Sequence, residues 1–567
     1  MTSSTYNNLA GLQGNLSTGE VLFLQLLKEG AHVSFVGPNA QGSQLLSALE
    51  RLQTSPNAAA LKIVPALTDM AAANMAVGFA QASSRPAVLV LNTGLGLANC
   101  LAAVYGASRI KTPLIILLEE PNSELINEDP PLSIHVLELA APVTKWSCQV
   151  RSPLEITRLT RRAITEANAP AKGPVLISIP SDILAQKAQT KVVDPPHTSP
   201  LGAADHTFIL KTARSLVSAQ NPCLIAGNEV SQYRARKELA TLAEVLGAPV
   251  YVESLPTGVN FANRHPQFGA VLPFDTDKSR EILQGHDLIL ALGMQTRLPT
   301  GKDQAPLVNP RTAVIQINVD PLLAGRTMQS IASANADIAE SLSRLRAEIQ
   351  LIADAKWVNI AKQRAQDTIG AIQNRRQKAE ESIDYPKESD PISVFWLLRI
   401  LDGLRPQNSI ILSDLTTESD PTSVLSLEGS SAFIGTNAGL EGYALAAAAG
   451  TQWASPDSMP IALTTDISFL QAPQSLWTIS RLKMQVKSVI VNLNGKHDNL
   501  VQNAITQNMG RKQGWFGQSD SPNACELAQS MHVPAYKART MGELNEGLME
   551  MFAAQGPFLI DVEIGTK

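Results

Sequence analysis

The sequence predicts an α/β protein built from three doubly wound domains, each with a parallel β-sheet. Three observations lead to this prediction. The chain has 567 residues, 44% of them hydrophobic, which is enough for several buried cores and too much for one small domain. Short β-branched runs alternate with helical patterns, as is typical of parallel sheets covered by helices. Two polar stretches interrupt the alternation and divide it into three sets.

The first set of elements predicts a domain over residues 1–187. Apolar, β-prone runs predict strands at 32–37, 61–67, 87–94, 113–120 and 173–180. Helical patterns lie between them, at 43–52, 70–82 and 95–110. The stretch QKAQTKVVDPPHTSPLG, which contains Pro and Thr, then breaks the alternation, so we predict a linker at 188–205.

The second set predicts a smaller doubly wound domain over residues 206–350. Its expected strands lie at 222–227, 248–254, 286–293 and 312–320, with a helix at 237–247. A long polar helical stretch follows, and we predict a helical connector at 351–388.

The third set predicts a domain over residues 389–567. Strands are expected at 409–415, 431–437, 459–466, 486–495 and 556–564, and helices at 439–454 and 469–482. Ala-rich segments such as AAANMAVGFAQA and GYALAAAAG predict helices whose small side chains allow close packing.

Composition argues against several classes of partner. The formal net charge of -5 and the scattered Lys and Arg residues give no basic field for nucleic acid. Four cysteines (Cys100, Cys148, Cys223, Cys525) show neither CxxC nor zinc-like spacing, which indicates buried thiols in a reducing compartment. The first residues lack a signal-peptide pattern, and no apolar run is long enough for a membrane span. We therefore expect a soluble, cytoplasmic protein.

The stretch LTTDISFL places a single aspartate, Asp466, between an expected strand and an expected helix. In parallel α/β domains, ligands bind at the carboxyl ends of strands, where helix N-termini and loop amides converge. Asp466 is therefore either a helix cap or part of a site.

A resemblance to a known family extends over nearly the whole chain. It is carried by segments that include ALTDMAAANMAVGFAQASSRPA, LGLANCLAAVYGASRIKTPLII, RHPQFGAVLP, LQGHDLILALG, SLWTISRL and VKSVIVNLNG. Together they resemble thiamine diphosphate-dependent enzymes of the acetolactate synthase and 2-oxo acid decarboxylase superfamily, with benzoylformate decarboxylases the nearest. The resemblance implies a pyrimidine-binding domain, a middle domain and a diphosphate-binding domain, with active sites shared between two subunits.

The resemblance also implies a metal and cofactor site around Asp466. The family has Gly-Asp-Gly where this chain has Thr465, Asp466 and Ile467, so the metal-binding carboxylate is kept and both glycines are replaced. The family's second ligand, an Asn, falls without a gap on Leu493, which cannot bind Mg²⁺. Either a slip of one residue brings Asn492 or Asn494 there, with the carbonyl of Lys496 as a third ligand, or the metal site is lost. For the slipped arrangement we assign Asp466, Asn494 and Lys496 as metal ligands.

The implied cofactor-binding residues share a position at the ends of expected strands in the third domain. They are Thr416, Thr417, Gly435, Thr436, Asn437, Leu440, Thr465, Asp466, Ile467 and Ser468. Each is also compatible with turn chemistry or packing. In the first domain, the loop with Asn39, Gln41, Gly42 and Ser43 corresponds to one that faces the substrate. The middle domain has a single glycine in AGNEVSQ and no GxGxxG, so we expect no FAD.

Three residues are assigned to catalysis. The family's glutamate, which contacts the aminopyrimidine, falls on Asp69, for which a helix N-cap is the alternative. The family's two proton-handling histidines fall on Asn92 and near Thr300, neither of which is an acid or base near neutral pH. His497 is the histidine left near the implied site, and a solvated loop histidine is its alternative.

Two functions of different class follow. The first is a thiamine diphosphate- and Mg²⁺-dependent lyase or carboligase that acts on a 2-oxo acid or related acyl donor. The second is a catalytically impaired member of this family that serves as a binding or regulatory subunit. A plain NAD-dependent dehydrogenase lacks its glycine fingerprint. We expect a homodimer or homotetramer, a small-molecule substrate, and neither nucleic acid nor membrane as a partner.

Overall fold

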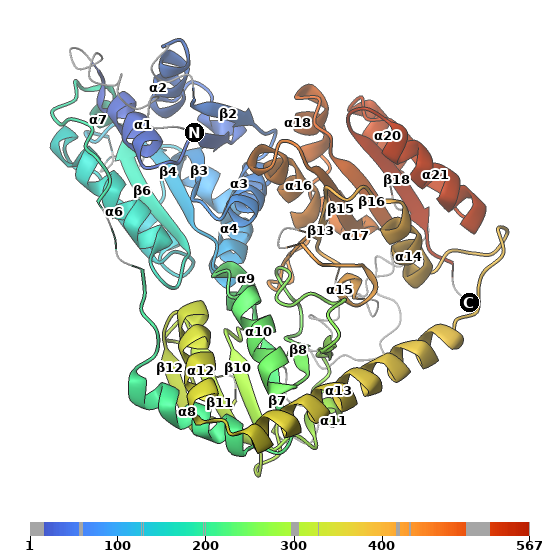
Figure 1. The fold of residues 1–567 in the computed structure, drawn as a ribbon. Helices are drawn as coiled ribbons and strands as arrows, with labels where there is room; N and C mark the ends of the chain where they lie inside the picture. The colour runs from blue at the N-terminus through green and yellow to red at the C-terminus, as the bar shows by residue number, and fades with distance from the viewer. Residues whose placement is uncertain are drawn as a thin grey trace.

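Three parallel six-stranded sheets form the framework of the chain (Figure 1). The computed structural model describes residues 16–565, except 56–59, 126–127, 129, 197, 199, 296–305, 327, 416–419, 430–431 and 495–521. The first and third sheets lie side by side at the top of Figure 1, and the middle sheet lies below them. The expected α/β class and the three doubly wound sheets are confirmed.

The first sheet has the strand order β2-β1-β3-β4-β6-β5. Its strands are β1 (Val33–Val36), β2 (Lys62–Pro65), β3 (Ala87–Asn92), β4 (Leu114–Glu120), β5 (Trp146–Gln149) and β6 (Pro174–Pro180). Its helices are α1 (Thr18–Lys28), α2 (Gln44–Gln53), α3 (Asp69–Ser83), α4 (Thr93–Arg109), α5 (Val136–Ala140), α6 (Ile156–Asn168) and α7 (Ser181–Ala185). Side chains of β3 alternate between two cores: Val88 and Val90 face α1, α2 and α6, whereas Leu89 and Leu91 face α3 and α4. Because β3 is buried on both faces, its residues from Ala87 to Leu91 are all apolar.

The middle sheet has the order β12-β11-β10-β7-β8-β9. Its strands are β7 (Pro222–Ala226), β8 (Val250–Val252), β9 (Phe268–Val271), β10 (Leu288–Leu292), β11 (Ala313–Asn318) and β12 (Ala332–Asn335). Its helices are α8 (His206–Ser218), α9 (Asn228–Gln232), α10 (Arg236–Leu246), α11 (Thr276–Leu283) and α12 (Ile338–Ile352). The polar helix α13 (Ala355–Glu381) then runs along the bottom of Figure 1 toward the third sheet.

The third sheet, β14-β13-β15-β16-β18-β17, repeats the topology of the first. Its strands are β13 (Ser409–Ser413), β14 (Phe433–Gly435), β15 (Met459–Thr465), β16 (Lys487–Asn492), β17 (Ala535–Ala538) and β18 (Phe558–Glu563). Its helices are α14 (Val394–Leu404), α15 (Pro421–Val424), α16 (Tyr443–Ala454), α17 (Asp466–Gln471), α18 (Ser475–Arg481), α20 (Ala524–Ser530) and α21 (Met541–Ala553).

Helices α3 and α16 join the first and third sheets into one hydrophobic core. Their contact is close because glycines lie in it: a Cβ on Gly78 would be 2.2 Å from the carbonyl oxygen of Ala447, and one on Gly450 would be 1.8 Å from that of Met75. The expectation that the Ala-rich segments form close-packing helices is thereby confirmed. No helix among the described residues is both long and apolar enough to cross a membrane.

Candidate functional site

The third sheet gathers polar residues at its topological switch point. After β13 the chain adds β14 on one side, and after β14 it returns to add β15 on the other. The carboxyl ends of β13 and β15 therefore flank the crevice where ligands bind in open α/β sheets. Asp414 follows β13 and Asp466 follows β15, and both side chains are buried.

Asp466 is the first residue of α17 and does not cap it. Thr465 is the N-cap, and its Oγ1 accepts a 3.1 Å hydrogen bond from the N–H of Ser468. The cap alternative for Asp466 is therefore wrong, because the residue before it already provides that oxygen. The Oδ1 of Asp466 accepts a 3.3 Å hydrogen bond from the N–H of Leu493, which ties the ends of β15 and β16 together.

The two asparagines after β16 have different surroundings. Asn492 is held on both sides: its Nδ2 donates to Oδ1 of Asp561 at 2.9 Å, and its Oδ1 accepts from the N–H of Asn494 at 2.9 Å. Asn494 is exposed and has a left-handed backbone with φ of 54°. Among the described residues, none bonds to the side-chain amide of Asn494. This difference favours Asn494 as a ligand.

Asp414 is a site residue that the sequence analysis missed. Its Oδ2 accepts hydrogen bonds from the N–H groups of Tyr443 and Ala444, at 3.1 and 3.0 Å, and from Oγ of Ser468 at 2.7 Å. Burial raises the pKa of Asp414, whereas these hydrogen bonds lower it. The signal was present in SIILSDL, where a carboxylate directly follows a buried strand.

The loop after β14 contains most of the remaining cofactor-binding candidates. Gly435 ends β14, and Oγ1 of Thr436 accepts from the N–H of Ala438 at 3.2 Å. The Oδ1 of Asn437 is buried and has no hydrogen-bond partner in the described part of the chain. Leu440 packs against Gly106 of α4, where a Cβ would lie 2.2 Å from its Cδ1. Ile467 is half-buried in α17.

Asp69 lies at the corresponding edge of the first sheet, as the first residue of α3. Thr68 is the N-cap of that helix, so the N-cap alternative for Asp69 is wrong. The Oδ2 of Asp69 accepts from Nδ2 of Asn39 at 2.8 Å and from Nδ2 of Asn99 at 3.0 Å. Its Oδ1 is buried against Gly37 and has no hydrogen-bond partner among the described residues.

The electrostatics of Asp69 favour proton exchange. Burial raises the pKa of its carboxyl, and the hydrogen bonds from Asn99 and Asn39 partly offset this rise. A carboxyl group whose pKa is raised toward the working pH can both accept and donate a proton. Asn39 was expected in this loop, whereas the contribution of Asn99, from a polar position of α4, was missed.

The structure gives less information about the other residues that were assigned to the site. Asn92 ends β3 and occupies the N-cap position of α4, but its side chain makes no capping hydrogen bond. Thr300, Thr416, Thr417, Lys496 and His497 lie outside the described residues. Among the described residues, no group of three or more His, Cys, Asp or Glu side chains could hold a metal ion. A metal at Asp466 would therefore depend on neutral oxygen ligands as well.

In the middle domain, buried glutamates occupy the carboxyl edge of the sheet. Glu229 accepts from the N–H groups of Val319 and Asp320, at 2.8 and 2.9 Å. Glu253 accepts from the N–H of Gln295 at 2.9 Å and from that of Asn228. These carboxylates use backbone N–H groups of the kind that hold a dinucleotide in other doubly wound domains. The absence of FAD stays a prediction.

Three stretches of the chain match descriptions of one enzyme family. Residues 16–138 match "Thiamine pyrophosphate enzyme, N-terminal TPP binding domain", residues 209–345 match its central domain, and residues 422–562 match its C-terminal TPP binding domain.

Curated proteins and solved structures show the same similarity. A benzoylformate decarboxylase of Pseudomonas aeruginosa is 27% identical, over 88% of this chain and 91% of its own. A probable acetolactate synthase large subunit of Methanocaldococcus jannaschii is 26% identical, over 96% and 91%. The structure of a benzoylformate decarboxylase from Polynucleobacter necessarius has the same fold, with a TM-score of 0.83 at 20% identity over 97% of this chain and 99% of its own.

Proposed function

We propose that this chain, which belongs to the thiamine pyrophosphate-dependent enzymes, binds thiamine diphosphate with Mg²⁺ and acts as a lyase or carboligase on a 2-oxo acid or related acyl donor. The observation that carries the proposal is the position of Asp466, which is buried at the switch point of the third sheet. Its Oδ1 accepts a hydrogen bond from Leu493, and the next residue, Asn494, has an exposed side-chain amide.

The residues at the third sheet fit a hard divalent cation. Mg²⁺ prefers carboxylate and amide oxygens, and it retains water where the protein supplies few ligands. Asp466 supplies a carboxylate, and the amide oxygen of Asn494 has no other hydrogen-bonding use among the described residues. The buried Oδ1 of Asn437, which has no hydrogen-bond partner in the described part of the chain, adds an acceptor for a polar ligand at the same edge. These residues would hold the metal and the diphosphate end of the cofactor.

The residues at the first sheet fit the other end of the cofactor. When bound, thiamine diphosphate supplies a nucleophilic carbon and an electron sink for reactions at carbonyl groups. Asp69 offers one carboxylate oxygen that is fixed by Asn39 and Asn99 and a second, Oδ1, that is unpartnered in the described structure. We expect Oδ1 to hold the proton exchanged with the aminopyrimidine. Sites shared between two subunits would bring these two edges together in a homodimer or homotetramer.

The reaction type follows from the residues that stand where the decarboxylases have histidines. Asn92 ends β3 at the first sheet and cannot exchange a proton near neutral pH. The chain would therefore lack this proton donor for the release of a protonated product. Carboligation, or cleavage of a substrate with a less demanding leaving group, fits these residues better than simple decarboxylation.

The test is calorimetric titration of the purified full-length protein with thiamine diphosphate, with and without Mg²⁺, repeated on Asp466→Asn. Mg²⁺-dependent binding that the substitution weakens at least roughly tenfold is expected, because one charged ligand contact is lost. Turnover would then be measured with a series of 2-oxo acids. Absence of cofactor binding under both conditions would contradict the proposal.

The alternative, a catalytically impaired binding or regulatory subunit, is favoured by one observation. Thr465, which replaces the first glycine of the family motif, uses its side chain to cap α17 and thus has a structural role. A protein that forms its oligomer but binds no thiamine diphosphate would support this alternative.

A further inference from the structure

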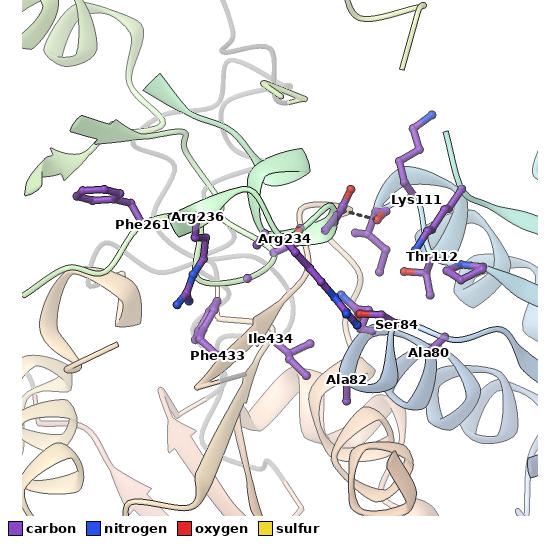
Figure 2. A pocket seen from close by; sticks show the side chains of 18 of the residues that line it. Ala80, Ala82, Ser84, Lys111, Thr112, Arg234, Arg236, Phe261, Phe433 and Ile434 are labelled. Atoms are coloured by element: carbon purple, nitrogen blue, oxygen red, sulfur yellow. Dashed lines mark hydrogen bonds between the residues drawn. The ribbon is translucent and has the colours of Figure 1, made fainter. Parts of the chain in front are cut away.

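A cavity of about 620 Å³ opens where the three domains meet (Figure 2). The first domain contributes the end of α3 and the turn after α4, the middle domain contributes α9, α10 and the segment 257–262, and the third domain contributes β14. The volume lies within the range of small-molecule sites, which often form between domains.

The charge of this cavity is opposite to that of the chain. Its described lining includes five Lys and Arg residues (Lys111, Lys172, Arg234, Arg236, Lys237) and no Asp or Glu. The chain as a whole has a formal net charge of -5. Cations that line a concave, low-dielectric surface focus the potential and attract anions.

Only part of this charge is neutralised within the protein. Nζ of Lys111 pairs with Oδ2 of Asp320 at 2.9 Å, and Arg236 donates to the carbonyl oxygens of Val259 and Glu428. Across the described chain, no carboxylate pairs with Lys172, Arg234 or Lys237. Burial and, after it, the charge of Arg234 lower the pKa of Lys172.

Part of the remaining wall of the cavity is apolar. Phe261, Phe433 and Ile434 line it, together with Ile110 and Ala82. In Figure 2, Arg234 points from the middle domain toward Ser84 at the end of α3, while Phe433 and Ile434 lie below it. Such a cavity suits a ligand that has both an anionic group and a ring or acyl portion.

We propose that this cavity binds a phosphate-bearing organic anion of about nucleotide size. Lys172, Arg234 and Lys237 contact the phosphate groups, and the aromatic wall contacts the organic portion. Arginine and lysine are the usual phosphate-binding residues, and an arginine can bind phosphate through two parallel hydrogen bonds.

The site is separate from the proposed cofactor residues but connected to them. Helix α3 begins at Asp69 and reaches the cavity at its other end, where Gln81 lines the wall. Nε2 of Gln81 donates to the carbonyl oxygen of Gly435 at 3.3 Å, and Oε1 accepts from the hydroxyl of Tyr443. A ligand in the cavity would therefore contact a residue that holds the strand before Thr436 and Asn437.

The test uses adenosine diphosphate as the probe, because it carries both required parts. Its binding to the full-length protein would be measured by calorimetry at two salt concentrations, beside adenosine and inorganic phosphate. We expect adenosine diphosphate to bind most tightly and its affinity to fall as salt rises. The double variant Lys172→Gln/Arg234→Gln should lose roughly tenfold or more in affinity.

Two control variants distinguish binding in this cavity from binding elsewhere on the protein. Arg214→Gln removes the charge of an exposed arginine of α8 outside the cavity and should leave binding unchanged. Asp466→Asn should also leave it unchanged, because the proposed cofactor site is elsewhere. If the double variant does not fold, Lys237→Gln, at an exposed position, should still lower the affinity.

Three results would overturn the proposal: no binding of adenosine diphosphate at millimolar concentration, equal affinity in the double variant, or loss of binding in Asp466→Asn. Equal affinity would mean that these cations do not contact the probe. Loss in Asp466→Asn would place the probe at the cofactor residues.

Discussion

Nδ2 of Asn99 donates a 3.0 Å hydrogen bond to Oδ2 of Asp69, so that α4 fixes the carboxylate at the start of α3. This bond favours the charged form of Asp69, against the burial that raises its pKa. We expect Asn99→Ala to raise the pKa of Asp69 further. The acid limb of the kcat/KM profile should then move to higher pH, which steady-state kinetics across pH would show.

Asp69→Asn removes the proton-exchanging group and keeps the shape of the side chain. Since general acid–base catalysis contributes roughly 100- to 10,000-fold, we expect turnover to fall by about that factor. Affinity for thiamine diphosphate should change far less, because the metal and diphosphate contacts lie at the third sheet. Unchanged turnover would show that Asp69 is structural.

Asn494→Ala should mainly lower cofactor affinity, whereas Asn492→Ala should mainly lower stability. Without Asn494 we expect Mg²⁺-dependent cofactor affinity to fall at least roughly tenfold, since the exposed amide would be lost as a metal ligand. The Tm should fall only slightly, because alanine is less favourable than asparagine at the left-handed φ of 54°. Without Asn492 the buried Asp561 loses a hydrogen bond, so the free energy of unfolding should fall by about 1–3 kcal/mol. Calorimetry and thermal unfolding of both variants would check this, and exchanged effects would assign the metal to Asn492.

Glu229 should make the middle domain less stable at high pH. Burial is the main cause that raises the pKa of Glu229 from 4.5 to about 7, and the charge of Asp320 adds to it. The folded state therefore binds the Glu229 proton more tightly than the unfolded state does. The resulting contribution to the free energy of unfolding is complete below pH 4.5 and is lost as pH rises through about 7. The contribution is about 3 kcal/mol at 1.36 kcal/mol for each pKa unit.

Glu229→Gln should remove this pH dependence. The measurement is the difference in unfolding free energy between wild type and variant from pH 4 to 8. Parallel curves across this range would contradict the assignment.

Gly450→Ala should separate α3 from α16. The added Cβ would meet the carbonyl oxygen of Met75 at 1.8 Å, and backbone atoms cannot move aside cheaply. Overpacking of this kind costs about 1–3 kcal/mol. The matched control is Gly370→Ala in α13, where nothing lies within 4 Å. It should stabilise the protein by about 0.5–1 kcal/mol, because alanine favours a helix. Chemical denaturation of both variants would show whether the free energy of unfolding falls in Gly450→Ala and rises in Gly370→Ala.

The strands that sequence reasoning missed are all edge strands. They are β5, β9, β12 and β17, and each lies at the end of its sheet. Central strands such as β10 are buried at every position, whereas β12 alternates between half-buried and exposed residues. A four-residue strand with one neighbour has little apolar content, and the pairing that forms it is made with a distant segment. Its sequence therefore gives a weak signal.

In the candidate site, too, some features were visible in the sequence and others arise only from contacts made on folding. The position of Asp466 at a strand end followed from a local pattern, because a carboxylate after an apolar β-run is visible in the sequence. The capping role of Thr465 and the burial of Asp414 beneath α16 depend on side chains that meet across the fold. Position relative to a strand is local, whereas hydrogen-bond partners are set by packing.

By itself, the sequence determined the α/β class, the three doubly wound sheets and the family, because hydrophobic periodicity and family motifs are properties of the chain order. The tertiary structure decided what each polar residue does. It separated Asn492 from Asn494 by their neighbours and paired Asp69 with Asn39 and Asn99. It also brought Lys172 and Arg234 to one cavity, which residues from three domains form only after the chain has folded.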